Sequence, residues 1–162
     1  MSSYDPQDLT DRLRLAGDEF IAFIESLDGS QLKSVTDPEG WPAGVVAHHV
    51  AVGAQFCSSL AEHVAKGGEL SWTPDFVNDV NAVHAETFAD ISKEEILDAL
   101  RTQFPDALKR IGGLTAEQLS RDLGEDKDFG EGPVRFAGDV IEKMMIVHTN
   151  DHLDSIKRAA AS

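Results

Sequence analysis

Long stretches of this sequence repeat their apolar residues every three or four positions, which is the period of an α-helix. No stretch shows the sustained two-residue alternation that indicates a half-buried β-strand. In the first stretch, the residues that share the apolar side are Leu9, Leu13, Phe20 and Ile24. The pattern predicts helices at residues 6–27, 42–65, 74–89, 93–111, 115–119 and 133–160.

Proline, glycine and capping residues mark the ends of these helices. Pro42 stands in a first-turn position, and Ser92 followed by Glu95 forms a capping-box pattern before residues 93–111. We expect Pro105 to kink or interrupt that helix. The acidic, glycine-rich residues 124–133 predict a solvated connection. Four main amphipathic helices, with short extra helices in the connections, indicate an all-α four-helix bundle, and we expect residues 1–162 to form one domain.

Charge and cysteine content argue against several classes of protein. The 162 residues include 14 Lys+Arg and 29 Asp+Glu, a formal net charge of −15. Such a surface repels phosphate backbones and anionic lipids, so we expect no nucleic-acid partner and no membrane partner. The sequence has neither an apolar run of roughly 18 residues nor the basic start of a signal peptide. Because Cys57 is the single cysteine, no internal disulfide can form, and we expect a cytoplasmic protein.

Three histidines fall on the apolar faces of two long helices. On a helical wheel, His49 lies in the middle of the apolar stripe of residues 42–65. His148 and His152 are four positions apart, so they are neighbours on one face, and that face also carries Ile141 and Met144. An imidazole aimed into a core needs a partner, because an unmatched buried polar group costs roughly 1–3 kcal/mol.

The partner of each imidazole can be another polar group of the core or a metal ion. A lone inward histidine is more often a hydrogen-bonded core residue. Two inward histidines one turn apart can instead chelate one metal, and a third from a facing helix would complete a three-histidine site with an open position. The convergence of His49, His148 and His152 favours the metal, although periodicity alone does not bring the two helices together.

The segments that carry these histidines resemble the DinB-like superfamily of four-helix-bundle proteins. Residues 40–50, which begin Gly-Trp-Pro and end His-His-Val, resemble the Trp-x7-His segment of the family's second helix. His148 and His152 resemble the His-xxx-His of the last helix, and residues 79–83 are similar to a stretch of its maleylpyruvate-isomerase-like branch. Counted from Trp41, the family's ligand position falls on His49. The resemblance thus implies that His49, His148 and His152 bind one divalent metal.

The same resemblance implies an activity and a co-substrate. The superfamily includes bacillithiol- and mycothiol-dependent transferases and a mycothiol-dependent isomerase. We therefore expect a metal-dependent enzyme that transfers a low-molecular-weight thiol to an electrophile, or a thiol-dependent isomerase. Zinc is the first expectation for three imidazoles, with nickel, iron and manganese left open. The alternative is a non-catalytic metal-binding or stress-response bundle without turnover.

Three further residues are candidates for binding substrate. His84 shares a face of residues 74–89 with several apolar residues, and Asn81 is a candidate through the resemblance. Asp151, beside the histidine pair, is placed to accept a hydrogen bond from a ligand imidazole or to bind a substrate amine. The simpler interpretation of Asp151 is a solvated charge on a helix face.

Two apolar residues of the last predicted helix point away from the histidine face. Ile146 and Leu153 are seven positions apart and fall on its opposite side. They indicate either a subunit contact or packing under a loop, so a homodimer is one expectation. Cys57, eight residues from His49, is expected to be a small core residue rather than a ligand.

Overall fold

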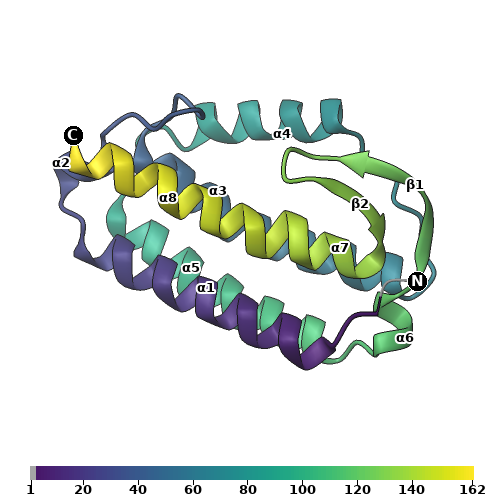
Figure 1. The fold of residues 1–162 in the computed structure, drawn as a ribbon. Helices are drawn as coiled ribbons and strands as arrows, with labels where there is room; N and C mark the ends of the chain where they lie inside the picture. Colours follow the sequence, from purple (N-terminus) through teal and green to yellow (C-terminus); the bar gives the residue numbers. More distant parts are fainter. Residues whose placement is uncertain (1–2) are drawn as a thin grey trace.

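The computed structural model describes residues 3–162, and its four long helices lie side by side as a bundle (Figure 1). Three of them are α1 (Pro6–Ser26), α3 (Ala43–Ala65) and α5 (Lys93–Gly112). The fourth is a C-terminal helix built from α7 (Ala137–Ile141), the π-helical segment η1 (Glu142–Val147) and α8 (His148–Ala161). Short helices α2 (Gly29–Leu32) and α6 (Ala116–Leu119) stand in the connections. The expected all-α bundle is confirmed.

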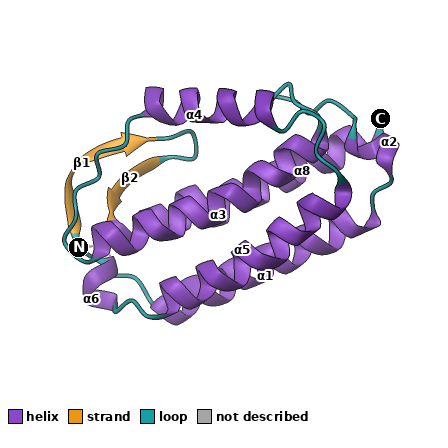
Figure 2. Cartoon of the chain, turned by 180° about the vertical axis from the view of Figure 1, so that it is seen from behind, coloured by secondary structure: helices purple, strands orange, loops and turns teal. Residues whose placement is uncertain are grey.

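A fifth helix of medium length, α4 (Pro74–Thr87), lies outside the bundle. In both views it runs along α3 and α8, on the side away from α1 and α5 (Figures 1 and 2). Thr73 caps it by accepting a hydrogen bond from the backbone N–H of Phe76. His84 is its one buried residue, so α4 contributes little to the core. It instead covers the face of α3 from which His48 and His49 arise.

The bundle is held by apolar side chains that the helical period predicts. In α1 the four residues expected to face inward are all buried: Leu9, Leu13, Phe20 and Ile24. Asp5 caps this helix by accepting a hydrogen bond from the N–H of Gln7, and Pro6 occupies its first turn. The helix α3 packs most extensively against α5 and is also covered by α7 and α8. Within residues 3–162, no helix combines the length and the hydropathy that a membrane span requires.

Pro105 was expected to kink or interrupt its helix, and the structure shows that it does not interrupt α5. The helix runs from Lys93 to Gly112 as one element with Pro105 inside it. Its start is the predicted capping box, in which the N–H of Ser92 donates to Glu95 and the N–H of Glu95 donates to Ser92 Oγ. Phe104 and Ala107 are both buried, so the helix packs against the core on both sides of the proline.

The connection expected to be a solvated loop is a β-hairpin, and this expectation is corrected. Strands β1 (Asp122–Asp128) and β2 (Pro133–Phe136) pair antiparallel, and the last helix therefore begins at Ala137 rather than at residue 133. Highly charged β1 has no apolar alternation that would indicate a strand. The hairpin is held from outside: Lys127 Nζ donates to the carbonyl oxygens of Leu70 and Trp72, at 2.7 and 3.3 Å. It lies beside the start of α4 (Figure 2).

The C-terminal helix is buried on two sides, which corrects the expectation that Ile146 and Leu153 lie on an outer face. Ile146 and Leu153 are buried rather than exposed. Both η1 and α8 contact α1 as well as α3, so the side opposite the histidines faces a second helix of the same chain. A helical wheel identifies apolar faces but not the element that covers them. These two residues therefore offer no subunit contact, and the homodimer stays a prediction without their support.

Candidate metal centre

Three histidine side chains converge where α3 crosses the C-terminal helix. His49 comes from the second turn of α3, His148 is the first residue of α8, and His152 follows one turn later. The Nε2 atom of His148 lies 2.9 Å from Nε2 of His49 and 3.1 Å from Nε2 of His152. The structure thus brings together the three residues singled out by the sequence, two of them 99 positions apart.

This donor set fits a divalent metal ion. Two imidazole nitrogens bound to one ion at about 2.0–2.1 Å lie about 2.9–3.4 Å apart for bond angles between a right angle and a tetrahedral angle. The observed Nε2 separations lie in that range. Hydrogen bonding alone leaves such a cluster poorly satisfied, because His148 Nε2 offers one proton or one lone pair to two neighbours.

The electrostatics of the cluster favour neutral imidazoles, which metal binding requires. Burial lowers the pKa of His49 to about 3, and the neighbouring imidazoles of His152 and His84 add to this. Burial likewise lowers the pKa of His148 well below its ordinary value, with His152 and His49 contributing. Both rings are therefore neutral at neutral pH, and each has one nitrogen whose lone pair is available to a cation.

A buried carboxylate, Glu39, orients the third imidazole. Its side chain is 10 % exposed, and Oε1 accepts hydrogen bonds from His152 Nδ1 and from Ser155 Oγ, both at 2.7 Å. A proton on His152 Nδ1 satisfies Glu39 and leaves Nε2 with the lone pair that a metal needs. Burial opposes ionisation of Glu39, but the bonds from His152 and Ser155 outweigh it and lower its pKa to about 2.

The loop before α3 places Glu39 and Trp41 around the centre. The N–H of Thr36 donates to the carbonyl of Trp41 at 2.8 Å, and Gly40 adopts a positive φ of 73°, so the loop folds back on itself. The ring of Trp41 then meets that of His49 edge-on, with centroids 5.7 Å apart. Sequence analysis did not identify Glu39, which lies among the turn residues 37–40, Asp-Pro-Glu-Gly. The Asp, Pro and Gly of this segment indicate a turn, but they do not predict which side chain of the turn faces α8.

A glycine leaves room for one of the rings. A Cβ atom added to Gly53 would stand 3.4 Å from Cε1 and 3.8 Å from Nδ1 of His148. At these distances an added Cβ would be in van der Waals contact with the imidazole, so the backbone at position 53 lies directly against the His148 ring. Gly53 therefore keeps the space in which His148 turns toward His49.

A second imidazole pair borders the centre. His48 Nδ1 and His84 Nε2 lie 2.8 Å apart, and their rings are stacked with centroids at 5.1 Å. The ring of His84 also stands 5.7 Å from that of His49. Burial is the main cause that lowers the pKa of His84, to about 4, and of His48. His84 thus docks α4 on α3, and its buried Nδ1 has no hydrogen-bond partner among the described residues.

The other two predicted substrate residues are not part of the donor cluster. Asn81 is half-buried on α4. Asp151 is exposed and lines a depression of about 350 Å³ together with Glu39 and His152. Their role in substrate binding therefore stays a prediction.

A small cavity adjoins the centre on the side of α4 and the hairpin. It measures about 80 Å³, and both His49 and His148 reach it. Its apolar walls include Trp72, Val77, Phe129 and Met144. Glu131, from the turn between β1 and β2, adds a carboxyl that sequence analysis missed, because that segment was read as a solvated loop.

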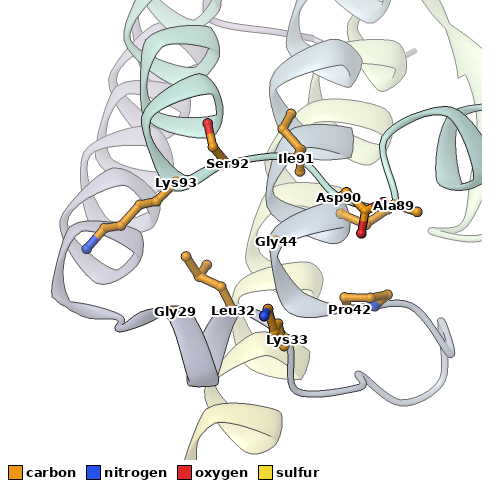
Figure 3. Close-up of a pocket in the computed structure, with 11 residues that line it drawn as sticks. Gly29, Leu32, Lys33, Pro42, Gly44, Ala89, Asp90, Ile91, Ser92 and Lys93 are labelled. Atoms are coloured by element: carbon orange, nitrogen blue, oxygen red, sulfur yellow. The ribbon is translucent and has the colours of Figure 1, made fainter.

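Size alone does not identify the site. A larger cavity of about 530 Å³ lies between α2, the start of α3 and the connection from α4 to α5 (Figure 3). It is lined by residues such as Leu32, Pro42 and Ile91 and contains no histidine. Lys93, at its edge, is engaged elsewhere, since Nζ donates to the carbonyl oxygens of Glu25 and Leu27. The histidine cluster, not the larger cavity, brings together groups able to do chemistry.

Comparison with known proteins agrees with this geometry. Neither a curated protein nor a solved structure matches the chain. The sequence profile of the DinB superfamily, however, matches residues 12–156. The match runs from the first turns of α1 almost to the end of α8, so it includes the whole bundle and all three convergent histidines. A helical bundle with this histidine cluster, matched over nearly its full length, belongs to the DinB superfamily.

Proposed function

We propose that this protein is a metal-dependent enzyme that transfers a low-molecular-weight thiol to an electrophile, or a thiol-dependent isomerase. The observation that carries the proposal is the convergence of the three imidazoles of His49, His148 and His152 beside a cavity. Membership of the superfamily supports a metal-binding helical protein. The thiol and the reaction come from the resemblance to thiol-dependent members.

His49, His148 and His152 would hold the ion, and Glu39 would keep His152 in the tautomer that binds it. When bound, a divalent ion with an open position supplies a Lewis acid that lowers the pKa of a thiol or water. Zinc suits three imidazoles, while nickel, iron and manganese are alternatives.

The residues around the histidines would control access to the centre. Trp72, Phe129 and Met144 form apolar walls that exclude water from the small cavity. Exclusion of water strengthens electrostatic interactions and protects an activated thiol from side reactions. Asn81, His84 and Asp151 are proposed to contact the substrate at the rim.

One observation favours a second candidate, a metal-binding or stress-response bundle without turnover. The cavity beside the centre measures about 80 Å³. Small-molecule sites typically measure roughly 300–1,000 Å³. On the side of His49 and His148 the centre therefore has little room for a substrate, as suits a protein that binds a metal without turnover.

The first experiment measures metal content by elemental mass spectrometry on untagged protein purified without added metal. Wild type is compared with His148→Ala and with the control His63→Ala, which removes an exposed histidine of α3. We expect about one metal per chain in wild type and in the control, and none in His148→Ala. No metal in wild type, even after reconstitution with zinc or nickel, would overturn the proposal.

The second experiment separates the two candidates. The metal-loaded protein is incubated with an electrophile and with mycothiol, bacillithiol or glutathione, and loss of free thiol is followed. Metal-dependent consumption supports the enzyme. No turnover with any of the three thiols supports the binding bundle.

A further inference from the structure

The turn of the β-hairpin carries Glu131 to the boundary between two depressions that flank the candidate metal centre. The cavity of about 80 Å³ reaches the centre through His49 and His148. The wider depression of about 350 Å³ reaches it through His152. Glu131 is the residue that lines both of them. A molecule that approaches the centre from either side therefore passes this carboxyl.

Glu131 is free to act on such a molecule. It is half-buried, yet it makes no hydrogen bond or ion pair with any residue in the range 3–162. Neither of its oxygens is among the fully enclosed atoms without a partner, so the carboxylate is not sealed inside the protein. It also lies outside the three-residue donor cluster. In contrast, Glu39 is committed to His152 and Ser155.

The turn that carries Glu131 is well defined. The flanking residues Gly130 and Gly132 have positive φ values of 113° and 106°, which a residue with a side chain rarely adopts. Asp128 Oδ1 accepts hydrogen bonds from the N–H groups of both glycines, at 2.8 and 3.3 Å. At the far end of the hairpin, Arg135 forms an ion pair with Asp122 at 2.7 Å. Glu131 is therefore presented by a braced turn rather than by a loose loop.

We propose, on the basis of the thiol chemistry proposed above, that Glu131 is the proton acceptor of this centre. The S–H bond of the entering thiol breaks, and its proton forms an O–H bond with the Glu131 carboxylate. The electron pair left on sulfur forms the new bond to the electrophile. Glu131 then returns the proton to the atom of the electrophile that has gained negative charge, so atoms and charge balance and the carboxylate is regenerated.

The surroundings of Glu131 suit a group that gains and loses a proton near neutrality. Burial is the largest cause that raises its pKa to about 7, and the carboxylates of Asp151 and Asp128 add to it. A general base is most effective when its pKa is close to the working pH. Asp154 and Arg158 line the same wider depression, and the Arg158 guanidinium donates a hydrogen bond to the carbonyl oxygen of Asp37, at 3.2 Å.

The other titratable groups near Glu131 do not replace it in this role. Cys57 faces it across the small cavity, but burial, with Glu131 adding, raises the pKa of that thiol to about 12. Lys143 lies beside Gly132, where a Cβ atom would stand 3.8 Å from its Cδ and Cε atoms. Among the described residues Lys143 forms no ion pair with Glu131, so the carboxyl keeps its raised pKa.

The test compares zinc-loaded wild type, Glu131→Gln and the control Glu125→Gln, which changes an exposed glutamate of the same hairpin. The probe is 2-mercaptoethanol at about pH 8, where a carboxyl of pKa about 7 is mostly ionised. Infrared difference spectra report whether a carboxyl becomes protonated when the thiol binds. We expect a protonated-carboxyl band in wild type and in Glu125→Gln, and none in Glu131→Gln.

Thiol affinity supplies a second readout, because the proposed role predicts tighter binding by the variant and a structural role predicts weaker binding. The amide of Glu131→Gln imitates the protonated carboxyl, so this variant should bind the probe up to about 10-fold more tightly than wild type at about pH 8. The advantage should vanish near pH 5.5, where wild type is already protonated. A merely structural role for Glu131 would weaken binding at both pH values instead.

Each contrary result has a separate meaning. If 2-mercaptoethanol does not bind to zinc-loaded wild type, the proposed function fails and this inference fails with it. If it binds but the infrared band is absent from wild type, or persists in Glu131→Gln, only the role of Glu131 is overturned. If Glu131→Gln loses zinc, the residue is a ligand and not a proton acceptor.

Discussion

At the scale of single residues, Glu39 determines how His152 is presented to the centre. It accepts a hydrogen bond from His152 Nδ1 and a second one from Ser155, and it does so from a loop 113 positions away along the chain. Its other oxygen, Oε2, is buried without a partner among residues 3–162. Burial of this oxygen without a partner lowers the stability of the folded protein. The orientation of His152 by Oε1 gives a reason for a carboxylate at this position.

We expect Glu39→Ala to lower metal affinity about 10–100-fold, because His152 loses the partner that fixes its tautomer and orientation. Competition with a chromophoric chelator measures this change. Ser155→Ala should have a smaller effect, and Glu69→Ala, at an exposed position, should have none. Equal affinities for Glu39→Ala and wild type would show that Glu39 does not orient a ligand.

Cys57 should be chemically inert in the folded protein. Its thiol is buried, and burial with the nearby Glu131 raises its pKa to about 12, so almost no thiolate exists at about pH 8. Alkylation by iodoacetamide should be at least about 100-fold slower in the folded chain than in urea, where the thiol has an ordinary pKa. Mass spectrometry of timed samples gives both rates. Similar rates would mean that the cavity opens readily.

At the scale of elements, Gly17 and Gly112 differ in the space that a side chain would have at their positions. A Cβ atom on Gly17 of α1 would stand 2.6 Å from Phe104 Cδ1, and Phe104 is buried in α5. Gly17 therefore allows α1 and α5 to approach closely. Gly112, at the end of α5, would bring its Cβ within 4 Å of nothing.

Gly17→Ala should therefore destabilise the protein by about 1–2 kcal/mol, because overpacking costs about 1–3 kcal/mol and only part is offset by the better helix propensity of alanine. Gly112→Ala, which changes propensity alone, should stabilise it by up to about 1 kcal/mol. Urea unfolding at matched m-values measures both. A stabilising Gly17→Ala would show that Phe104 moves aside freely.

At the scale of the whole molecule, one continuous apolar core joins the four long helices. It runs from Leu9 in α1 through Val50 in α3 and Leu100 in α5 to Ile156 in α8. A core of this extent leads us to expect a bundle that folds without the metal. A metal bound at the three histidines would add to stability without being required for folding.

Removal of metal should thus lower the melting temperature moderately and leave the helices intact. Free metal at 100 times its Kd stabilises the folded state by about 2.7 kcal/mol, which for a chain of this length corresponds to roughly 5–10 °C. Circular dichroism during melting, with and without a chelator, tests this. Loss of the helical signal at 25 °C on chelation would identify a structural metal instead.

Local sequence pattern was enough to predict the long helices, their buried faces and the three inward histidines. These features follow from apolar period and capping residues, which act over a few positions: Phe20 and Ile24 are buried as expected, and Ser92 caps α5 as expected. The three-dimensional contacts were needed to reveal the hairpin, the burial of Ile146 and the approach of Glu39 and Glu131 to the centre. Each of these features depends on contacts between segments far apart along the chain. Local periodicity identifies an apolar face but does not predict which segment will cover it.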